Sequence, residues 1–155
     1  MALEIERKFL VVGQFKEFAT SSERISQGYI SSNPERSVRV RIKGDSAFLT
    51  IKGVTNSYGM SRYEWEKSIS LEEASELIKL CEPGLIDKIR YFVPFNGVIF
   101  EVDEFKGENQ GLLMAEVELS DEQQRVELPS WIGDEVTGDI RYYNSSLVKN
   151  PYSKW

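Results

Sequence analysis

The sequence has 155 residues, of which 41% are hydrophobic and 28% charged, and these proportions are typical of a globular domain. Its 25 acidic and 19 basic residues give a net charge of −6, which argues against the basic surface of a nucleic-acid-binding protein, so we expect no nucleic-acid partner. The sequence contains no histidine, so acid–base and metal chemistry must come from carboxylates, lysine, tyrosine or bound water.

Alternation of polar and apolar residues, the pattern of a β-strand, recurs along most of the chain. It predicts eight strands, at Leu3–Leu10, Ile25–Ser31, Ser37–Lys43, Ala47–Gly53, Arg62–Ile69, Ile86–Pro94, Val98–Phe105 and Met114–Leu119. Gly44-Asp45 and Asn96-Gly97 lie between neighbouring strands and predict tight hairpin turns. No repeat or linker-like segment interrupts the chain, so we expect residues 1–155 to form a single domain.

Helical spacing of apolar residues appears in fewer places. Leu71 to Cys81 predicts a helix with Ser70 as its N-cap and Glu73 three residues later, as in a capping box. We also expect a short helix over residues 14–19 and a C-terminal helix over residues 139–149. Residues 121–138 are predicted to be irregular.

Charged residues share one face of seven of the predicted strands, and apolar residues occupy the opposite face. The carboxylates are Glu4, Glu6, Glu64, Glu66, Glu101, Asp103, Glu116 and Glu118, and the bases are Lys8, Arg39, Arg41, Lys52, Lys88 and Arg90. A face exposed to water normally mixes charged side chains with Ser, Thr and Gln. Here most strands carry charges of one sign about 7 Å apart, which repel and would stabilise a water-facing sheet little.

This pattern predicts an α+β fold, mainly antiparallel β, in which eight strands close into a tunnel-like β-barrel with a few helices packed outside. Fourteen charges cannot lie in a dry interior, so the interior must hold water and ions. Eight acids and six bases leave a charge of −2, which two divalent metal ions change to about +2, and a triphosphate brings roughly four or five negative charges. We expect residues 141–144 to cover one mouth of the tunnel.

The sequence also indicates a location. No apolar run is long enough to span a membrane, and Met1-Ala2 lead into a charged segment without a signal-peptide pattern. The single cysteine, Cys81, excludes an internal disulfide and suits a reducing compartment. We therefore expect a cytoplasmic protein with no membrane partner.

Taken in order, the charged strand motifs resemble those of the CYTH superfamily, the triphosphate tunnel metalloenzymes. They are the ExExK run Glu4-Ile5-Glu6-Arg7-Lys8, Val38-Arg39-Val40-Arg41, Leu49-Thr50-Ile51-Lys52, Tyr63-Glu64-Trp65-Glu66, Lys88-Ile89-Arg90-Tyr91, Phe100-Glu101-Val102-Asp103 and Ala115-Glu116-Val117-Glu118. The resemblance runs through nearly the whole chain and implies an eight-stranded antiparallel tunnel, a triphosphate substrate and dependence on a divalent metal. It is strongest to small bacterial members labelled adenylate cyclase-like, several of which are inorganic tripolyphosphatases.

The resemblance also implies roles for particular residues. Substrate phosphates would be bound by Lys8, Arg39, Arg41, Lys52, Lys88 and Arg90, and Mg²⁺ or Mn²⁺ by Glu4, Glu6, Glu116 and Glu118. Glu6, Lys8, Lys52 and Lys88 are the candidate catalytic residues. Glu64, Glu66, Glu101 and Asp103 would support a second metal, orient the attacking water or pair with the bases.

The expected function is that of a metal-dependent triphosphatase, most simply one that splits tripolyphosphate into pyrophosphate and phosphate. The same motifs leave open a class IV adenylate cyclase, a thiamine triphosphatase and a non-catalytic polyphosphate-binding module. The oligomeric state, including a homodimer, is also left open by the sequence.

Overall fold

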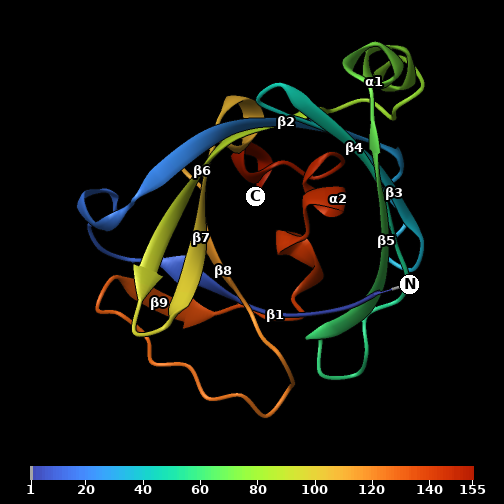
Figure 1. Ribbon diagram of the computed structural model, residues 1–155. Coiled ribbons are helices and arrows are strands. Elements are labelled where there is room, and N and C mark those ends of the chain that lie inside the picture. The colour runs from blue at the N-terminus through green and yellow to red at the C-terminus, as the bar shows by residue number, and fades with distance from the viewer. Residues whose placement is uncertain (1) are drawn as a thin grey trace.

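The computed structural model describes residues 2–155, which form a closed barrel of eight antiparallel strands with a ninth strand attached to it (Figure 1). The strands are β1 (Ala2–Val11), β2 (Ser21–Ser31), β3 (Ser37–Lys43), β4 (Ser46–Lys52), β5 (Ser61–Ile69), β6 (Ile86–Phe95), β7 (Val98–Phe105), β8 (Leu113–Glu118) and β9 (Ile132–Glu135). Around the barrel the order is β5-β4-β3-β2-β6-β7-β8-β1, and pairing of β1 with β5 closes it. The predicted fold class is confirmed.

The strands follow the predicted alternation, and their turns follow the predicted turn residues. Gly44 joins β3 to β4 with φ +59°, and Asn96 and Gly97 join β6 to β7 with φ +45° and +86°, the left-handed conformation of tight hairpins. The prediction for residues 121–138 was wrong in part, because Ile132–Glu135 form β9 beside the end of β1. Gly133 and Asp134 are poor strand formers, so this short strand has no alternating signal.

The apolar faces of the strands point outward and are covered by other parts of the chain. On β6, β7 and β8, Val93, Phe100 and Val117 pack beneath Phe15 and Trp131, which come from the segments between strands. The rings of Phe100 and Trp131 meet edge to face, with centroids 5.6 Å apart. The core of this domain therefore surrounds the barrel, and the barrel interior is free for polar residues.

Helix α1 (Leu71–Ile78) packs on the outside of the barrel, as predicted (Figure 1). Ser70 Oγ accepts a hydrogen bond from the Glu73 backbone N–H, and the Glu73 carboxylate accepts one from the Ser70 N–H, so the predicted capping box is present. Ala74 is fully buried against Val40 and Ala47. The helix ends at Ile78, earlier than predicted, and the predicted helix over residues 14–19 is a 3₁₀ turn at Lys16–Phe18.

The C-terminal segment lies within the outline of the barrel rather than outside it (Figure 1). It consists of a 3₁₀ turn at Ile140–Tyr142 and the short helix α2 (Asn144–Leu147), instead of one continuous helix over 139–149. Leu147 and Tyr142 join an apolar cluster with Phe105 and Met114 of the barrel. Helices packed outside were therefore predicted correctly for α1, whereas α2 closes off part of the tunnel. No helix in residues 2–155 is long and apolar enough to cross a membrane.

Candidate active site inside the barrel

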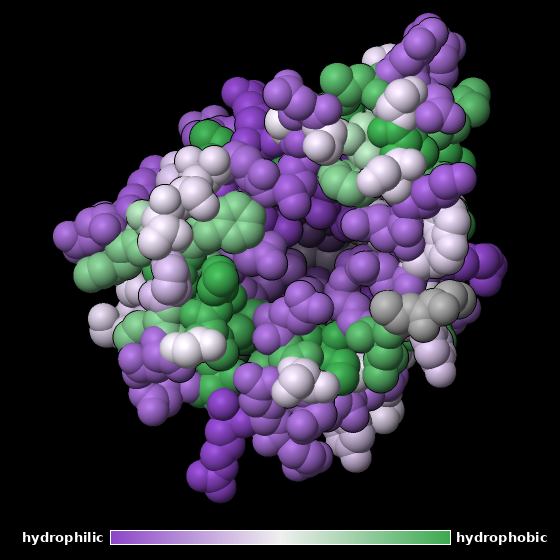
Figure 2. Space-filling model, viewed as in Figure 1, coloured by the Kyte–Doolittle hydropathy of each residue, from purple (hydrophilic) through white to green (hydrophobic). Residues whose placement is uncertain are grey.

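A cavity of about 290 Å³ lies inside the barrel, and its walls are almost entirely polar. Figure 2 shows it as a central hollow surrounded by hydrophilic residues, with hydrophobic residues farther out. Eight bases and seven carboxylates line it: Lys8, Arg39, Arg41, Lys43, Lys52, Arg62, Lys88, Arg90, Glu4, Glu6, Glu64, Glu66, Glu101, Glu116 and Glu118. Seven strands contribute to this set, so the charged faces converge as the sequence predicts.

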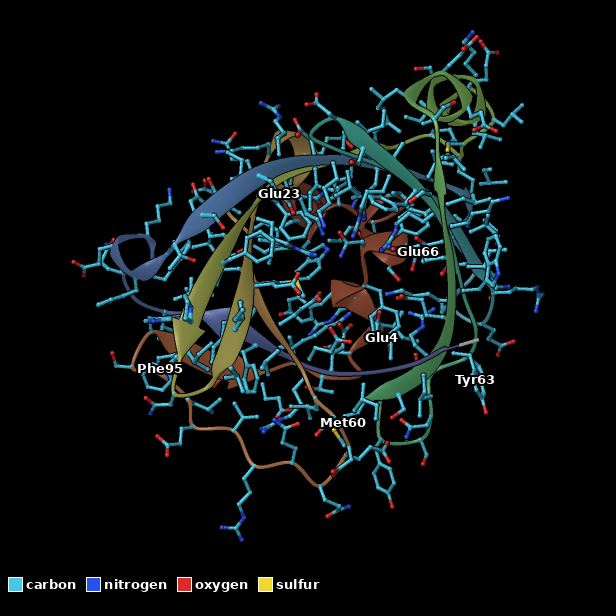
Figure 3. All side chains as sticks on the ribbon, viewed as in Figure 1. Glu4, Glu23, Met60, Tyr63, Glu66 and Phe95 are labelled. Atoms are coloured by element: carbon cyan, nitrogen blue, oxygen red, sulfur yellow. The ribbon has the colours of Figure 1, made fainter. Side chains whose placement is uncertain are left out.

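The lining includes each of the fourteen charged residues singled out from the sequence except Asp103. Figure 3 shows Glu4 and Glu66 inside the ring of strands. Tyr63 lies on β5 like Glu66 but on the opposite face of the strand, and it points outside the ring. Arg7, whose parity also differs, lies outside the cavity and pairs with Glu135 on β9 at 2.8 Å. Strand parity therefore separates the tunnel residues from the outer ones.

Asp103 forms a buried ion cluster beneath the tunnel wall. Its carboxylate accepts hydrogen bonds from Lys88 Nζ at 2.8 Å and from Arg90 Nε and Nη2 at 2.8 and 2.9 Å. Lys88 and Asp103 are 1% and 2% exposed. Although burial alone would raise the pKa of Asp103, the charges of Arg90 and Lys88 hold it well below its usual range. Among the roles considered, this geometry favours pairing with the bases.

Four bases crowd the adjoining wall. Arg39 is nearly buried, and its Nη2 donates to Thr50 at 3.1 Å, while its Nε has no hydrogen-bond acceptor among residues 2–155. Arg41 Nε donates to Gln27 at 2.7 Å. Burial and then the charges of Arg39 and Arg90 lower the pKa of Arg41 to about 9. Lys88, also buried, has a pKa below its ordinary value. Depressed basic pKa values and an unmet donor indicate a wall that an anion would stabilise.

The carboxylates gather mainly on β1 and β8, where Glu6 faces Glu118 and Lys8 faces Glu116 across the strand pair. Glu4 forms an ion pair with Lys52 at 2.9 Å, and Glu6 lies 3.5 Å from Lys8. Glu116 and Glu118 form no salt bridge with any described residue. Two acids therefore face the cavity without a basic partner.

Burial and then the charge of Glu6 raise the pKa of Glu116. Burial and then the charges of Glu4 and Glu101 raise the pKa of Glu118. A cation near these groups would relieve both effects, because it favours the ionised carboxylates. Their oxygen atoms are the ligands that Mg²⁺ and Mn²⁺ prefer. The donor chemistry thus fits a hard divalent cation, although no three acidic groups in residues 2–155 are already gathered as ligands.

Eight lining residues are not among the fourteen charged residues selected from the sequence: Tyr29, Ser37, Lys43, Thr50, Arg62, Tyr143, Asn144 and Ser145. Arg62 lies two residues before Glu64 on the same face of β5, and Lys43 lies two residues after Arg41, so alternation alone would have found both. Tyr143, Asn144 and Ser145 enter the cavity from the C-terminal segment. Tyr143 and Asn144 belong to residues 141–144, which were expected to cover one mouth of the tunnel, but no strand periodicity marks any of the three as a lining residue.

Comparison with known proteins gives consistent results. The model of the family described as CYTH domain matches residues 2–152. A protein of Acetivibrio thermocellus named inorganic triphosphatase is 49% identical over 156 residues, covering 100% of this chain and 99% of its own. An inorganic triphosphatase of Nitrosomonas europaea is 36% identical, covering 94% of this chain and 96% of its own. A crystal structure described as an inorganic triphosphatase superposes with a TM-score of 0.69 at 32% identity, covering 96% of this chain and 95% of that chain.

Proposed function

The chain belongs to the CYTH domain family, and from this premise we propose that it is a metal-dependent inorganic triphosphatase that converts tripolyphosphate and water into pyrophosphate and phosphate. The observation that carries the proposal is the tunnel itself, in which eight bases and seven carboxylates converge on one cavity. Inorganic triphosphatases that match nearly the full length of the chain support the same activity.

The bases would bind the phosphate chain. Guanidinium groups bind phosphate oxygens through paired hydrogen bonds, and lysines add compact positive charge. Arg39 has a donor still to be satisfied, and the depressed pKa of Arg41 would rise beside an anion. We assign Arg39, Arg41 and Arg90 to phosphate binding, together with Lys88 on the same strand as Arg90 and with Lys8 and Lys52 on other strands. Because these six residues come from four strands, β1, β3, β4 and β6, they would contact the phosphate chain from more than one side.

The carboxylates of β1 and β8 would hold Mg²⁺ or Mn²⁺, with Glu116 and Glu118 as the main ligands and Glu4 and Glu6 beside them. When bound, such an ion neutralises charge on the phosphate oxygens and lowers the pKa of coordinated water. Glu64, Glu66 and Glu101 line the same cavity and remain candidates for a second ion or for orienting water.

Hydrolysis of a phosphoanhydride depends chiefly on positioning and charge neutralisation. Lys8, Lys52 and Lys88 would stabilise the negative charge that shifts to the leaving pyrophosphate as the P–O bond to the terminal phosphorus breaks. Glu6 lies beside Lys8 and would accept a hydrogen bond from the attacking water, aligning it with the terminal phosphorus. These four residues are the catalytic group in our proposal.

We also propose that the protein acts in the cytoplasm. Cys81 is a partly buried free thiol, and a reducing compartment would keep this thiol reduced.

A substrate panel tests the proposed function. Phosphate release from tripolyphosphate, ATP and thiamine triphosphate is measured with Mg²⁺, with Mn²⁺ and with EDTA, and cyclic AMP formation from ATP is measured in parallel. We expect kcat/KM to be highest for tripolyphosphate and activity to disappear with EDTA. Cyclic AMP as the main product, or metal-dependent binding of tripolyphosphate without hydrolysis, would contradict the proposal.

A further inference from the structure

The ring of Tyr143 lies against a lysine that the proposed function places among the catalytic residues. Lys8 Nζ is 4.5 Å from the centroid of the Tyr143 ring, within the range of a cation–π contact. Tyr143 is 5% exposed, and both residues line the tunnel cavity. Such contacts strengthen as the pair is shielded from water, and only 11% of the Lys8 side chain is exposed.

The ring is held from several directions. The Tyr143 hydroxyl group and Thr55 Oγ1 lie 3.1 Å apart in a hydrogen bond, which ties the ring to the segment between β4 and β5. The Tyr143 N–H donates to the Ile140 carbonyl, and the Tyr143 carbonyl accepts from Leu147 at 3.0 Å. The residue thus sits between two short helical turns, which fix both its backbone and its side chain.

The two cations near this ring differ in how else they are held. Arg62 lies 5.6 Å from the ring centroid, but it also donates to the carbonyls of Gly53 and Pro34 and is 3.5 Å from Ser37 Oγ. Within the described chain, Lys8 Nζ has Glu6 as its ion-pair partner, at 3.5 Å. The Tyr143 ring therefore contributes more to fixing the position of Lys8 than to fixing that of Arg62.

Without the ring, Lys8 would move closer to Glu6. That shift would take its positive charge away from the phosphate and would engage the carboxylate that we assign to orienting water. Overall attraction for the substrate would change little, because seven other bases line the cavity.

We propose that Tyr143 is a positioning residue, whose ring holds the Lys8 ammonium group in the tunnel at the place from which it acts on the substrate. This inference rests on the proposed function for its catalytic consequence, but the contact itself can be tested without activity.

The first test is spectroscopic. Protons above an aromatic ring resonate upfield, so NMR of the Lys8 ε-methylene group, assigned by its loss in Lys8→Arg, should show a shifted signal. We expect the shift to persist in Tyr143→Phe and to disappear in Tyr143→Leu. The matched control is Tyr142→Leu, which removes the neighbouring ring that packs against Trp155 and should leave the Lys8 signal in place. An unshifted Lys8 signal in the wild-type protein overturns the proposal, even if Tyr143→Leu fails to fold.

The second test is kinetic and uses tripolyphosphate with Mg²⁺. Tyr143→Leu should lower kcat by about tenfold, the magnitude of a buried cation–π contact, with KM changed less than about twofold. Tyr143→Phe and Tyr142→Leu should keep kcat within about twofold of wild type. An equal loss in Tyr143→Phe and Tyr143→Leu would overturn the role of the ring, as would an unchanged kcat in Tyr143→Leu. Absence of activity in the wild-type protein would instead refute the proposed function and leave the spectroscopic result to decide the contact.

Discussion

At the scale of single residues, the two unpaired acids of β8 and the buried acid of β7 differ in their surroundings. Glu116 and Glu118 face the cavity without a basic partner in the described chain, whereas Asp103 is surrounded by Lys88 and Arg90. In the proposed function the first two would bind the metal and support turnover, whereas the ion pairs of the third give it a mainly structural role.

Replacing Glu116 or Glu118 by Gln should abolish most metal-dependent activity. We expect kcat/KM with Mg²⁺ to fall by about 100-fold or more, because even residues that only support metal ligands contribute about 10–100-fold. The control is Glu76→Gln on α1, which removes one exposed negative charge far from the tunnel lining. Full metal-dependent turnover in both tunnel variants would show that the metal site is assigned to the wrong residues.

Asp103→Asn should destabilise the protein severely. It leaves Lys88 and Arg90 buried without their counter-charge, and breaking a buried pair in this way costs about 3–5 kcal/mol. The matched control is Asp87→Asn, whose partner Arg24 is largely exposed, and which should cost no more than about 1 kcal/mol. Urea unfolding measures both changes, and similar losses in the two variants would argue against a structural role for Asp103.

At the scale of elements, the segment between β4 and β5 is tied to the C-terminal segment by a close backbone contact. Gly59 has φ +77°, and a Cβ there would overlap the Cα of Gly138. The same region holds Thr55, the hydrogen-bond partner of Tyr143. Contact between these glycines therefore brings the two segments together beside the cavity.

Gly59→Ala should destabilise the protein more than Gly97→Ala does. Both positions have positive φ, which costs an alanine about 1–2 kcal/mol, but Gly97 has open space around it. The difference between the two variants in free energy of unfolding isolates the close approach, and we expect it to exceed about 1 kcal/mol. Equal effects in thermal or urea unfolding would mean that the two segments separate easily.

The elements also show how far sequence reasoning reaches. Alternation predicted the eight barrel strands and their inward faces because a strand repeats every two residues, so Glu64 and Glu66 follow directly from the pattern. The same rule would have included Arg62. Residues 141–144 were expected at one mouth of the tunnel, but alternation could not identify Tyr143 or Asn144 as lining residues, because they reach the cavity through tertiary packing of a short irregular segment. Strand β9 was not predicted, because it forms through tertiary pairing with β1 despite the weak strand propensity of Gly133 and Asp134.

At the scale of the whole molecule, the barrel reverses the usual arrangement of a small domain. Its hydrophobic core lies outside the sheet, under Trp131, Phe15 and α1, and its charges lie inside. This arrangement costs stability unless ions enter, because buried like charges repel. Bases on one wall and unpaired acids on another suit a polyanion together with divalent cations. Binding of a polyanion and divalent cations inside the barrel would thus explain both the inverted core and the charged lining.

The most direct test of this explanation is a crystal structure of the Glu116→Gln variant, chosen for slow turnover, with tripolyphosphate and Mg²⁺. We predict a triphosphate within the barrel, its oxygens bound by Arg39, Arg41 and Arg90, with Mg²⁺ on the side of Glu118. Tripolyphosphate bound only on the outer surface of the barrel, with the tunnel bases still paired to carboxylates, would contradict the account.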